Sequence, residues 1–205
     1  MHISFSHYLI INRADNDELI VALKLSDSEE TRKIWDDNKF SLIYEVKLSD
    51  QGNALTCTAT IENLNEEKAL EFDICFHTYF KVSNISNVRI SNLQNLKYFD
   101  KVDNQAEKRQ EEAVLSIANE TDRIYCDTPD VIEIADENRK YVLKKDNLPD
   151  AVVWNPWIEK SKAFADLPDD GYLDFVCVEA GKVAQRFSLP RGERLTSSQT
   201  LRANL

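Results

Sequence analysis

The chain has 205 residues, of which 42% are hydrophobic and 30% are charged, a balance typical of a soluble globular protein. Single all-β domains commonly reach roughly 200–250 residues, so we expect one domain over residues 1–205. The formal net charge of −11 argues against binding to nucleic acid or to anionic membranes, and no apolar run approaches the ~20 residues of a membrane span.

Four cysteines, Cys57, Cys75, Cys126 and Cys177, are present, and none forms a C-x-x-C pair. This spacing argues against a zinc or redox site. Cys57, Cys75 and Cys177 lie within apolar alternating runs, which predicts buried free thiols in a reducing compartment. The first residues carry no basic cluster before their apolar part, so they do not resemble a signal peptide, and we expect a cytoplasmic protein.

A short helix is the first element expected in chain order, over Ser26–Trp35, with Ser26 as its cap and Glu29 as the capping-box partner. Alternation of period two then predicts strands over Ser41–Ser49, Ala54–Ile61, Leu70–Phe80, Val88–Leu93, Val131–Ala135, Tyr141–Lys145, Ala151–Trp154 and Phe175–Val183. Glu159–Ala165 is expected to form a second short helical segment. Many short strands separated by turns indicate an all-β antiparallel sandwich or barrel.

Two of these strands carry a titratable group on a face that also holds apolar residues. In Leu70–Phe80 the alternation places Cys75, His77 and Tyr79 on one face. In Phe175–Val183 it places Cys177 and Glu179 on one face. An unpaired buried charge is costly, so His77 and Glu179 each need a partner.

His77 and Glu179 are the residues best suited to proton transfer. An imidazole titrates near pH ~6.5, and an apolar surrounding raises the pKa of a glutamate and makes it a better proton acceptor. Periodicity alone favours the structural interpretation, in which His77 is a hydrogen-bonded core histidine and Glu179 a rim residue. Both interpretations stay open on this evidence.

Two further segments could contribute to a binding site. Trp154-Asn155-Pro156-Trp157 could form a sugar-stacking rim, with the Asn155 amide bonding hydroxyl groups, or it could be a packed turn. Asp122 precedes a short strand over Ile124–Cys126 and could equally form a local ion pair. The chain has one credible histidine and no nucleotide-binding or metalloprotease motif, so we expect no dedicated metal site.

The motifs along the chain resemble those of the glucose-6-phosphate 1-epimerases, or hexose-6-phosphate mutarotases, of the aldose 1-epimerase superfamily. The matching runs, in the family's order and spacing, are His77-Thr78-Tyr79-Phe80 with Val82–Val88, Leu96–Lys101, Thr121–Tyr125 with Thr128-Pro129, Ala151–Trp157 and Val176–Ala180. The resemblance extends from about Val21 to the end of the chain.

This resemblance implies a galactose-mutarotase-like antiparallel β-supersandwich and interconversion of the α and β anomers of a hexose 6-phosphate. It implies that His77 is the general acid, which protonates the ring oxygen. Glu179 would be the general base, which takes the proton of the anomeric hydroxyl, and Asp122 would hold sugar hydroxyls. These roles need neither a metal nor an organic cofactor.

The N-terminal residues depart from the family pattern. The family's early segment carries a second histidine and phosphate-gripping arginines, whereas residues 1–20 are divergent and do not reproduce it. We therefore expect a fold that is incomplete at its N-terminus, with an exposed sheet edge that a partner or a dimer covers. A non-catalytic sugar-phosphate-binding or regulatory protein is the main alternative, and a glycoside hydrolase using Asp122 and Glu179 is a third.

Overall fold

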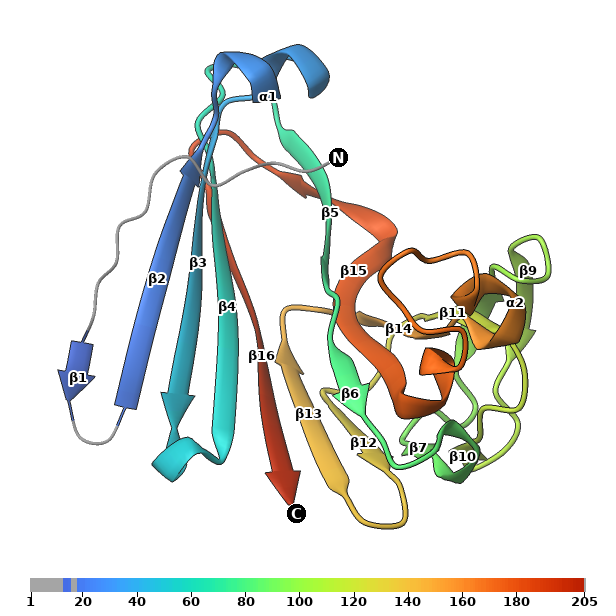
Figure 1. Ribbon diagram of the computed structural model, residues 1–205. Coiled ribbons are helices and arrows are strands. Elements are labelled where there is room, and N and C mark those ends of the chain that lie inside the picture. Colours follow the sequence, from blue (N-terminus) through green and yellow to red (C-terminus); the bar gives the residue numbers. More distant parts are fainter. Residues whose placement is uncertain (1–12, 16–17, 205) are drawn as a thin grey trace. The chain divides into compact units, whose positions relative to one another are not determined.

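The computed structural model describes residues 13–15 and 18–204, and Figure 1 shows that strands dominate it. The chain divides into two compact units: Met1–Asp73 with Arg186–Thr200, and Ile74–Gln185 with Leu201–Leu205. Strands β5 (Leu70–Phe76), β15 (Phe175–Leu189) and β16 (Arg194–Asn204) contribute residues to both units. The single domain expected over residues 1–205 stays a prediction. Most of the divergent segment over residues 1–20 lies outside the described residues.

The first unit holds strands that pair in the order β1-β2-β3-β4-β16. Their bounds are β1 Arg13–Asp15, β2 Glu18–Ser26, β3 Phe40–Ser49 and β4 Ala54–Asn63, with a short 3-10 turn, η1, over Asp50–Gly52. The pairs β1–β2, β2–β3 and β3–β4 are antiparallel. The predicted strands Ser41–Ser49 and Ala54–Ile61 are thereby confirmed, whereas β2 was not expected.

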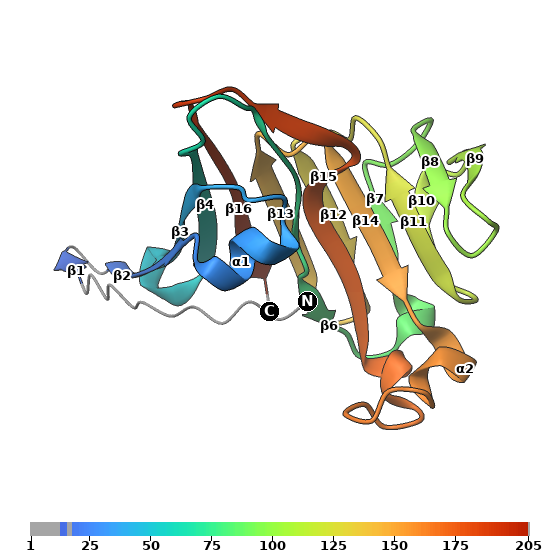
Figure 2. The same cartoon turned by 90° about the horizontal axis from the view of Figure 1, so that it is seen from above.

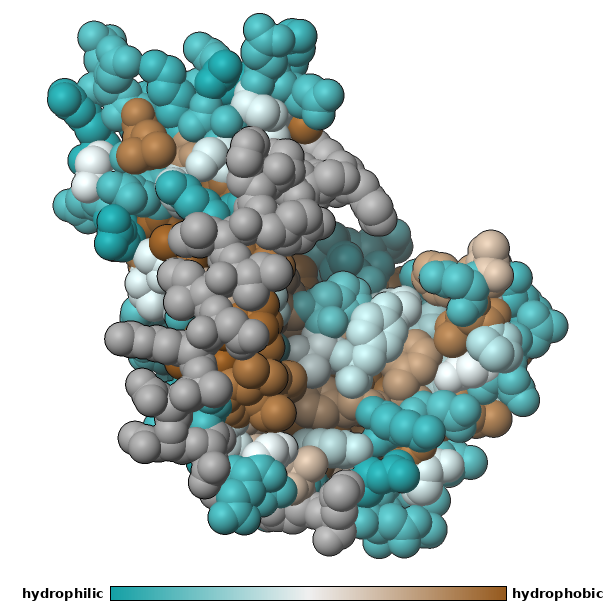
Figure 3. Space-filling view, turned by 60° about the vertical axis from the view of Figure 1, so that its left-hand side comes forward, coloured by the Kyte–Doolittle hydropathy of each residue, from teal (hydrophilic) through white to brown (hydrophobic). Residues whose placement is uncertain are grey.

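One face of this sheet is apolar throughout. Residues directly opposite each other on antiparallel strands share a face, and the register brings together Leu19, Val21, Leu23, Leu25, Leu42, Tyr44, Val46, Leu48, Leu55, Cys57, Ala59 and Ile61. On this apolar face Leu19 and Leu48 remain 47% and 38% exposed. Hydrophobic side chains gather at the surface in the space-filling view of Figure 3. The other face carries threonines, and the hydroxyls of Thr56 and Thr200 lie 2.9 Å apart.

The helix expected over Ser26–Trp35 is shorter, and its cap is a different serine. Helix α1 spans Glu29–Ile34, and the capping box joins Ser28 to Thr31. The expectation of Ser26 and Glu29 in these roles was wrong because Ser26 is still in β2, paired with Ser41. The chain leaves the strand only after Ser26, which moves the first helical turn by two residues.

The second unit contains two groups of paired strands, one in the order β13-β12-β7-β10 and one in the order β15-β14-β11-β8-β9. Figure 2 shows β15, β14, β11 and β8 side by side in that order. The bounds are β6 Tyr79–Lys81, β7 Arg89–Ser91, β8 Lys97–Asp100, β9 Ala106–Arg109, β10 Val114–Leu115, β11 Thr121–Tyr125, β12 Val131–Ala135, β13 Lys140–Asp146, β14 Asp150–Asn155 and α2 Trp157–Ser161, with short 3-10 turns η2 over Ile85–Asn87 and η3 over Gly171–Asp174.

Both strand groups contribute fully buried side chains to the core of this unit. Ile90, Ile132, Ile134 and Leu143 come from one group, and Tyr125, Val153, Val176 and Val178 come from the other. Asp136 follows β12, and its carboxylate accepts hydrogen bonds from the backbone N–H groups of Ser83, Asn138 and Arg139. These bonds connect the loop at Ser83 to the turn after β12. No helix among the described residues is long and apolar enough to cross a membrane.

The predicted strand Leu70–Phe80 is interrupted, and this interruption positions a candidate residue. β5 ends at Phe76 and β6 begins at Tyr79. Between them the N–H of Thr78 donates to the carbonyl of Phe76 at 2.9 Å, a tight turn that ends the pairing. His77 therefore sits at the turn rather than within a continuous strand. Strands over the other predicted segments of this unit are confirmed: Val131–Ala135 has the expected bounds, and the others differ by one to several residues at their ends.

Candidate active site

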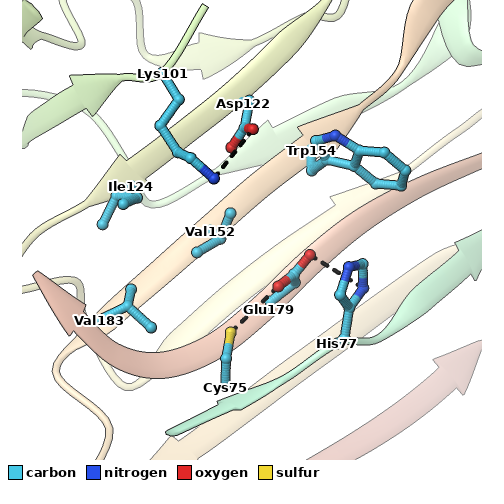
Figure 4. Close-up of a pocket in the computed structure, with 9 residues that line it drawn as sticks. All are labelled: Cys75, His77, Lys101, Asp122, Ile124, Val152, Trp154, Glu179 and Val183. Carbon is cyan, nitrogen blue, oxygen red and sulfur yellow. Dashed lines mark hydrogen bonds and ion pairs between the residues drawn. The ribbon is translucent and has the colours of Figure 1, made fainter. Parts of the chain in front are cut away.

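A cavity of about 310 Å³ opens in the second unit, a size within the range usual for small-molecule sites. It is lined by Cys75, His77, Lys101, Asp122, Ile124, Val152, Trp154, Glu179 and Val183. Figure 4 shows these side chains and the interactions among them. Four of the five residues predicted for the site, His77, Glu179, Asp122 and Trp154, line this cavity.

Strand register explains why these residues meet. Glu179 on β15 lies opposite Val152 on β14, which in turn lies opposite Ile124 on β11. Two residues along, Trp154 on β14 lies opposite Asp122 on β11. Directly opposed residues share a face of the sheet, so both rows form one wall of the cavity.

His77 and Glu179 are in direct contact. The Nδ1 atom of His77 lies 3.1 Å from Oε1 of Glu179, a distance at which a protonated imidazole forms an ion pair with the carboxylate. Glu179 is 5% exposed, whereas the His77 side chain is 53% exposed. The partner that each residue was expected to need is therefore the other one, and the Nε2 side of the imidazole remains available to a ligand.

The Cys75 thiol donates a hydrogen bond to the second oxygen of the Glu179 carboxylate. Its Sγ atom lies 3.2 Å from Oε2 of Glu179. The strands approach closely here, because a Cβ atom at Gly181 would lie 2.7 Å from the carbonyl oxygen of Ile74 and 3.1 Å from Cys75 Sγ. Cys75 was expected to be a buried thiol and is instead exposed, since it lines the cavity.

The surroundings of Glu179 favour proton uptake. Burial raises the pKa of this carboxyl, an effect that the hydrogen bond from Cys75 and the nearby His77 oppose only in part. A raised pKa brings a glutamate closer to the range in which general bases operate. The arrangement therefore pairs an exposed imidazole with a buried carboxylate of increased basicity.

Aromatic rings surround His77. The Tyr79 ring stacks on the imidazole with centroids 5.0 Å apart and planes 11° apart, and Trp154 meets His77 edge-on at 5.7 Å. Tyr79 is 57% exposed, so one face of this cluster is open to ligand. Such rings offer the flat apolar surface on which a sugar can stack.

An ion pair lies on the other side of the cavity. Lys101 Nζ lies 3.3 Å from Oδ2 of Asp122, and the Lys101 N–H donates to the backbone carbonyl of Asp122 at 2.8 Å. Arg123, the next residue along β11, is placed differently, with its guanidinium 4.8 Å from the centre of the Tyr98 ring. Lys101 therefore brings a positive charge to the cavity wall, and Arg123 does not line the cavity.

Asn155, the fifth predicted site residue, does not line the cavity. Its side chain is fully buried. The amide donates to the carbonyls of Tyr172 and Phe175, each at 2.9 Å, and its oxygen accepts from the N–H of Trp157 at 3.0 Å. The geometry gives Asn155 a structural role in the turn after β14, as the packed-turn interpretation of this segment expects.

Three side chains at the site are close enough to be considered for a metal. One ligand atom each of His77, Cys177 and Glu179 lies within 4.8 Å of the others. Burial raises the pKa of the Cys177 thiol, whereas a metal ligand must be a thiolate, and structural zinc sites use four protein ligands. The set fits a proton-transfer pair better than a metal site, and the expected absence of a metal stays a prediction.

Comparison with known proteins places this chain among sugar epimerases. The family model for aldose 1-epimerase matches residues 6–202. The chain is 36% identical over 176 residues to the "Putative glucose-6-phosphate 1-epimerase" of Cenchrus ciliaris, covering 84% of this chain and 53% of the relative. It is 30% identical over 190 residues to the protein of the same name in Escherichia coli K12, covering 92% of this chain and 61% of the relative.

Solved structures agree on the fold. The "putative mutarotase" of Salmonella typhimurium superimposes with a TM-score of 0.83 at 27% identity, covering 96% of this chain and 64% of that one. A galactose mutarotase-like protein from Lactobacillus casei gives a TM-score of 0.74 at 15% identity, covering 95% of this chain and 73% of that one. The expected all-β galactose-mutarotase-like fold is confirmed. This chain spans between about half and two thirds of the length of the sequence relatives above. The family match over residues 6–202 shows that it belongs to the aldose 1-epimerase family.

Proposed function

We propose that this chain interconverts the α and β anomers of a hexose 6-phosphate by acid–base catalysed ring opening. The observation that carries the proposal is the contact of 3.1 Å between His77 Nδ1 and Glu179 Oε1 at the wall of a sugar-sized cavity. The names of the relatives in Cenchrus ciliaris and Escherichia coli support the choice of substrate.

The two residues start the reaction in complementary states. Glu179, as carboxylate, takes the proton of the anomeric hydroxyl while His77, as imidazolium, gives a proton to the ring oxygen, so the bond between C1 and the ring oxygen breaks and an aldehyde forms. Rotation about the C1–C2 bond and reversal of both transfers close the ring on the other face. Well-placed acids and bases each supply roughly 10²–10⁴-fold, which suits a reaction that also proceeds unaided.

The remaining cavity residues fit the rest of the substrate. Asp122 can accept hydrogen bonds from sugar hydroxyls, and Trp154 offers a ring for stacking. Besides His77, Lys101 is the basic side chain that lines the cavity among the described residues, and a lysine acts as a point charge toward phosphate. We assign it to the anionic group of the substrate, a role for which the divergent residues 1–20 do not reproduce the family's arginines.

We further propose that the protein is cytoplasmic and binds neither nucleic acid nor membranes. Four free cysteines suit a reducing cytoplasm, and the net charge of −11 disfavours nucleic acid and anionic membranes as partners. β1 pairs only with Glu18–Ile20 of β2, so the rest of that edge has no strand partner among the described residues. We propose that a second copy of the chain covers this edge or the apolar face. Analytical ultracentrifugation should then show a dimer, and a monomer at all protein concentrations would contradict the proposed dimer.

Anomer exchange measured by NMR tests the proposed activity. The protein should increase the exchange rate of glucose 6-phosphate above the buffer rate, and Lys101→Met should weaken the preference for glucose 6-phosphate over glucose. Binding of hexose phosphate by calorimetry with no increase in exchange would instead indicate the non-catalytic binding protein. Release of reducing sugar from a glycoside panel would indicate the hydrolase.

A further inference from the structure

We propose that Cys75 is a positioning residue for Glu179, whose thiol donates a hydrogen bond to Oε2, orients the carboxylate toward His77 and favours its ionised form. This inference deepens the proposed function and rests on it for its catalytic meaning. Cys75 lies outside the motif runs that carry the family resemblance, the nearest of which begins at His77.

The geometry constrains the carboxylate from two directions. Oε2 of Glu179 lies 3.2 Å from Cys75 Sγ, and Oε1 lies 3.1 Å from His77 Nδ1. With the thiol on one oxygen and the imidazole beside the other, rotation of the carboxylate would break at least one of the two contacts. A Cβ atom added at Gly181 would lie 3.1 Å from the Cys75 sulfur, so glycine at this position leaves space for the thiol beside Glu179.

The charges around the site make the thiol a donor. Although the Cys75 residue is exposed to the cavity, the protein around its sulfur desolvates the thiol, and this desolvation and the neighbouring Glu179 raise the pKa of Cys75. The sulfur therefore keeps its proton at neutral pH, and the carboxylate is the acceptor. Hydrogen bonds to the charged form of a carboxyl favour that form. The other titratable or charged groups that face or act on the Glu179 carboxyl are His77, Tyr79, Lys101, Asp122 and Cys177.

Removal of the donor should therefore make Glu179 harder to ionise. In Cys75→Ala and Cys75→Val the carboxylate loses the hydrogen bond from the thiol but keeps its burial and its contact with His77. The pKa of Glu179 should rise by about half to one unit, because a thiol is a weak donor and one unit corresponds to ~1.4 kcal/mol. Cys75→Ser keeps a hydroxyl donor and should titrate close to the unmodified protein.

The direct measurement is a pH titration of the Glu179 side-chain carboxyl by carbon-13 NMR in the full chain. The same variants should move the acid limb of the pH–rate profile for glucose 6-phosphate exchange to higher pH. Below that limb they should lower kcat more than they raise KM. Cys126→Ala, at a buried cysteine outside the cavity, is the matched control and should shift neither quantity.

Equal Glu179 titrations in the unmodified protein and in both donorless variants would overturn the inference. So would a shift in Cys75→Ser as large as that in Cys75→Ala, because the effect would then follow from packing. The NMR titration reads Glu179 whether or not the chain is active. Absence of exchange activity would therefore refute the proposed function alone, while an unchanged titration would refute the role of Cys75 alone.

Discussion

Replacement of Asn155 by alanine separates a structural role from a substrate-binding role. The buried amide makes two donor contacts of 2.9 Å to carbonyls and one acceptor contact of 3.0 Å. A typical hydrogen bond contributes about 0.5–1.5 kcal/mol net, and a buried group left without its partner costs about 1–3 kcal/mol. The three contacts together predict a loss of about 2–4 kcal/mol in the free energy of unfolding.

Urea unfolding provides the assay. With a slope of about 2 kcal/mol/M, a loss of about 3 kcal/mol would lower the midpoint by about 1.5 M. Asn119→Ala, at an exposed asparagine, is the control and should stay within about 0.5 kcal/mol. If Asn155→Ala instead had the same urea midpoint as the unmodified protein and raised KM for the sugar phosphate, the structural interpretation would be refuted. The result would support the predicted role of Asn155 in binding.

Three further changes have defined outcomes. Burial opposes ionisation of Asp136, but its backbone N–H donors outweigh burial and lower its pKa. Asp136→Asn should therefore cost about 1–3 kcal/mol at neutral pH. In urea titrations the difference should shrink as the pH falls below ~4 and vanish once Asp136 is protonated in the folded protein as well. A cost independent of pH would contradict this. Trp154→Ala should weaken sugar-phosphate binding by about tenfold in calorimetry, and unchanged affinity would remove Trp154 from the site. Dialysis against a chelator should leave the exchange rate unchanged, and a loss restored by zinc would show a metal site.

The sequence predicted most strands because alternation is a local property of the chain. Val131–Ala135 is found with the same bounds as expected, and most other predicted strands differ by one or a few residues at their ends. The interruption at His77 was not predictable, since it depends on a turn between Phe76 and Thr78 within an unbroken alternating run. The cap of α1 was misplaced because pairing of Ser26 with Ser41 lengthens β2.

The candidate site was predicted in part for the same reason. Alternation placed His77 and Glu179 on partly buried faces and required a partner for each, but it could not show that they meet. Their contact depends on residues separated by about a hundred positions in the chain, which only the fold brings together.

Two cavity residues went unnoticed although the sequence held a signal for each. Cys75 shares the face of His77 by parity, yet an apolar run made it look like a buried thiol. Lys101 lies within a motif that carried the resemblance, yet nothing local showed that its ammonium reaches the cavity. Asn155, at a motif position that looked suited to binding, is buried, and its predicted role in binding stays a prediction that Asn155→Ala tests.

The central claim is that His77 and Glu179 form the acid–base pair. The most direct test measures the exchange rate of glucose 6-phosphate anomers with the unmodified protein, His77→Asn and Glu179→Gln. Both substitutions preserve side-chain size and remove one proton-transfer group. We expect the unmodified protein to exceed the buffer rate and each variant to lose roughly 10²–10⁴-fold of that acceleration. Variants that retain the rate of the unmodified protein would contradict the assignment of His77 and Glu179 as the acid–base pair.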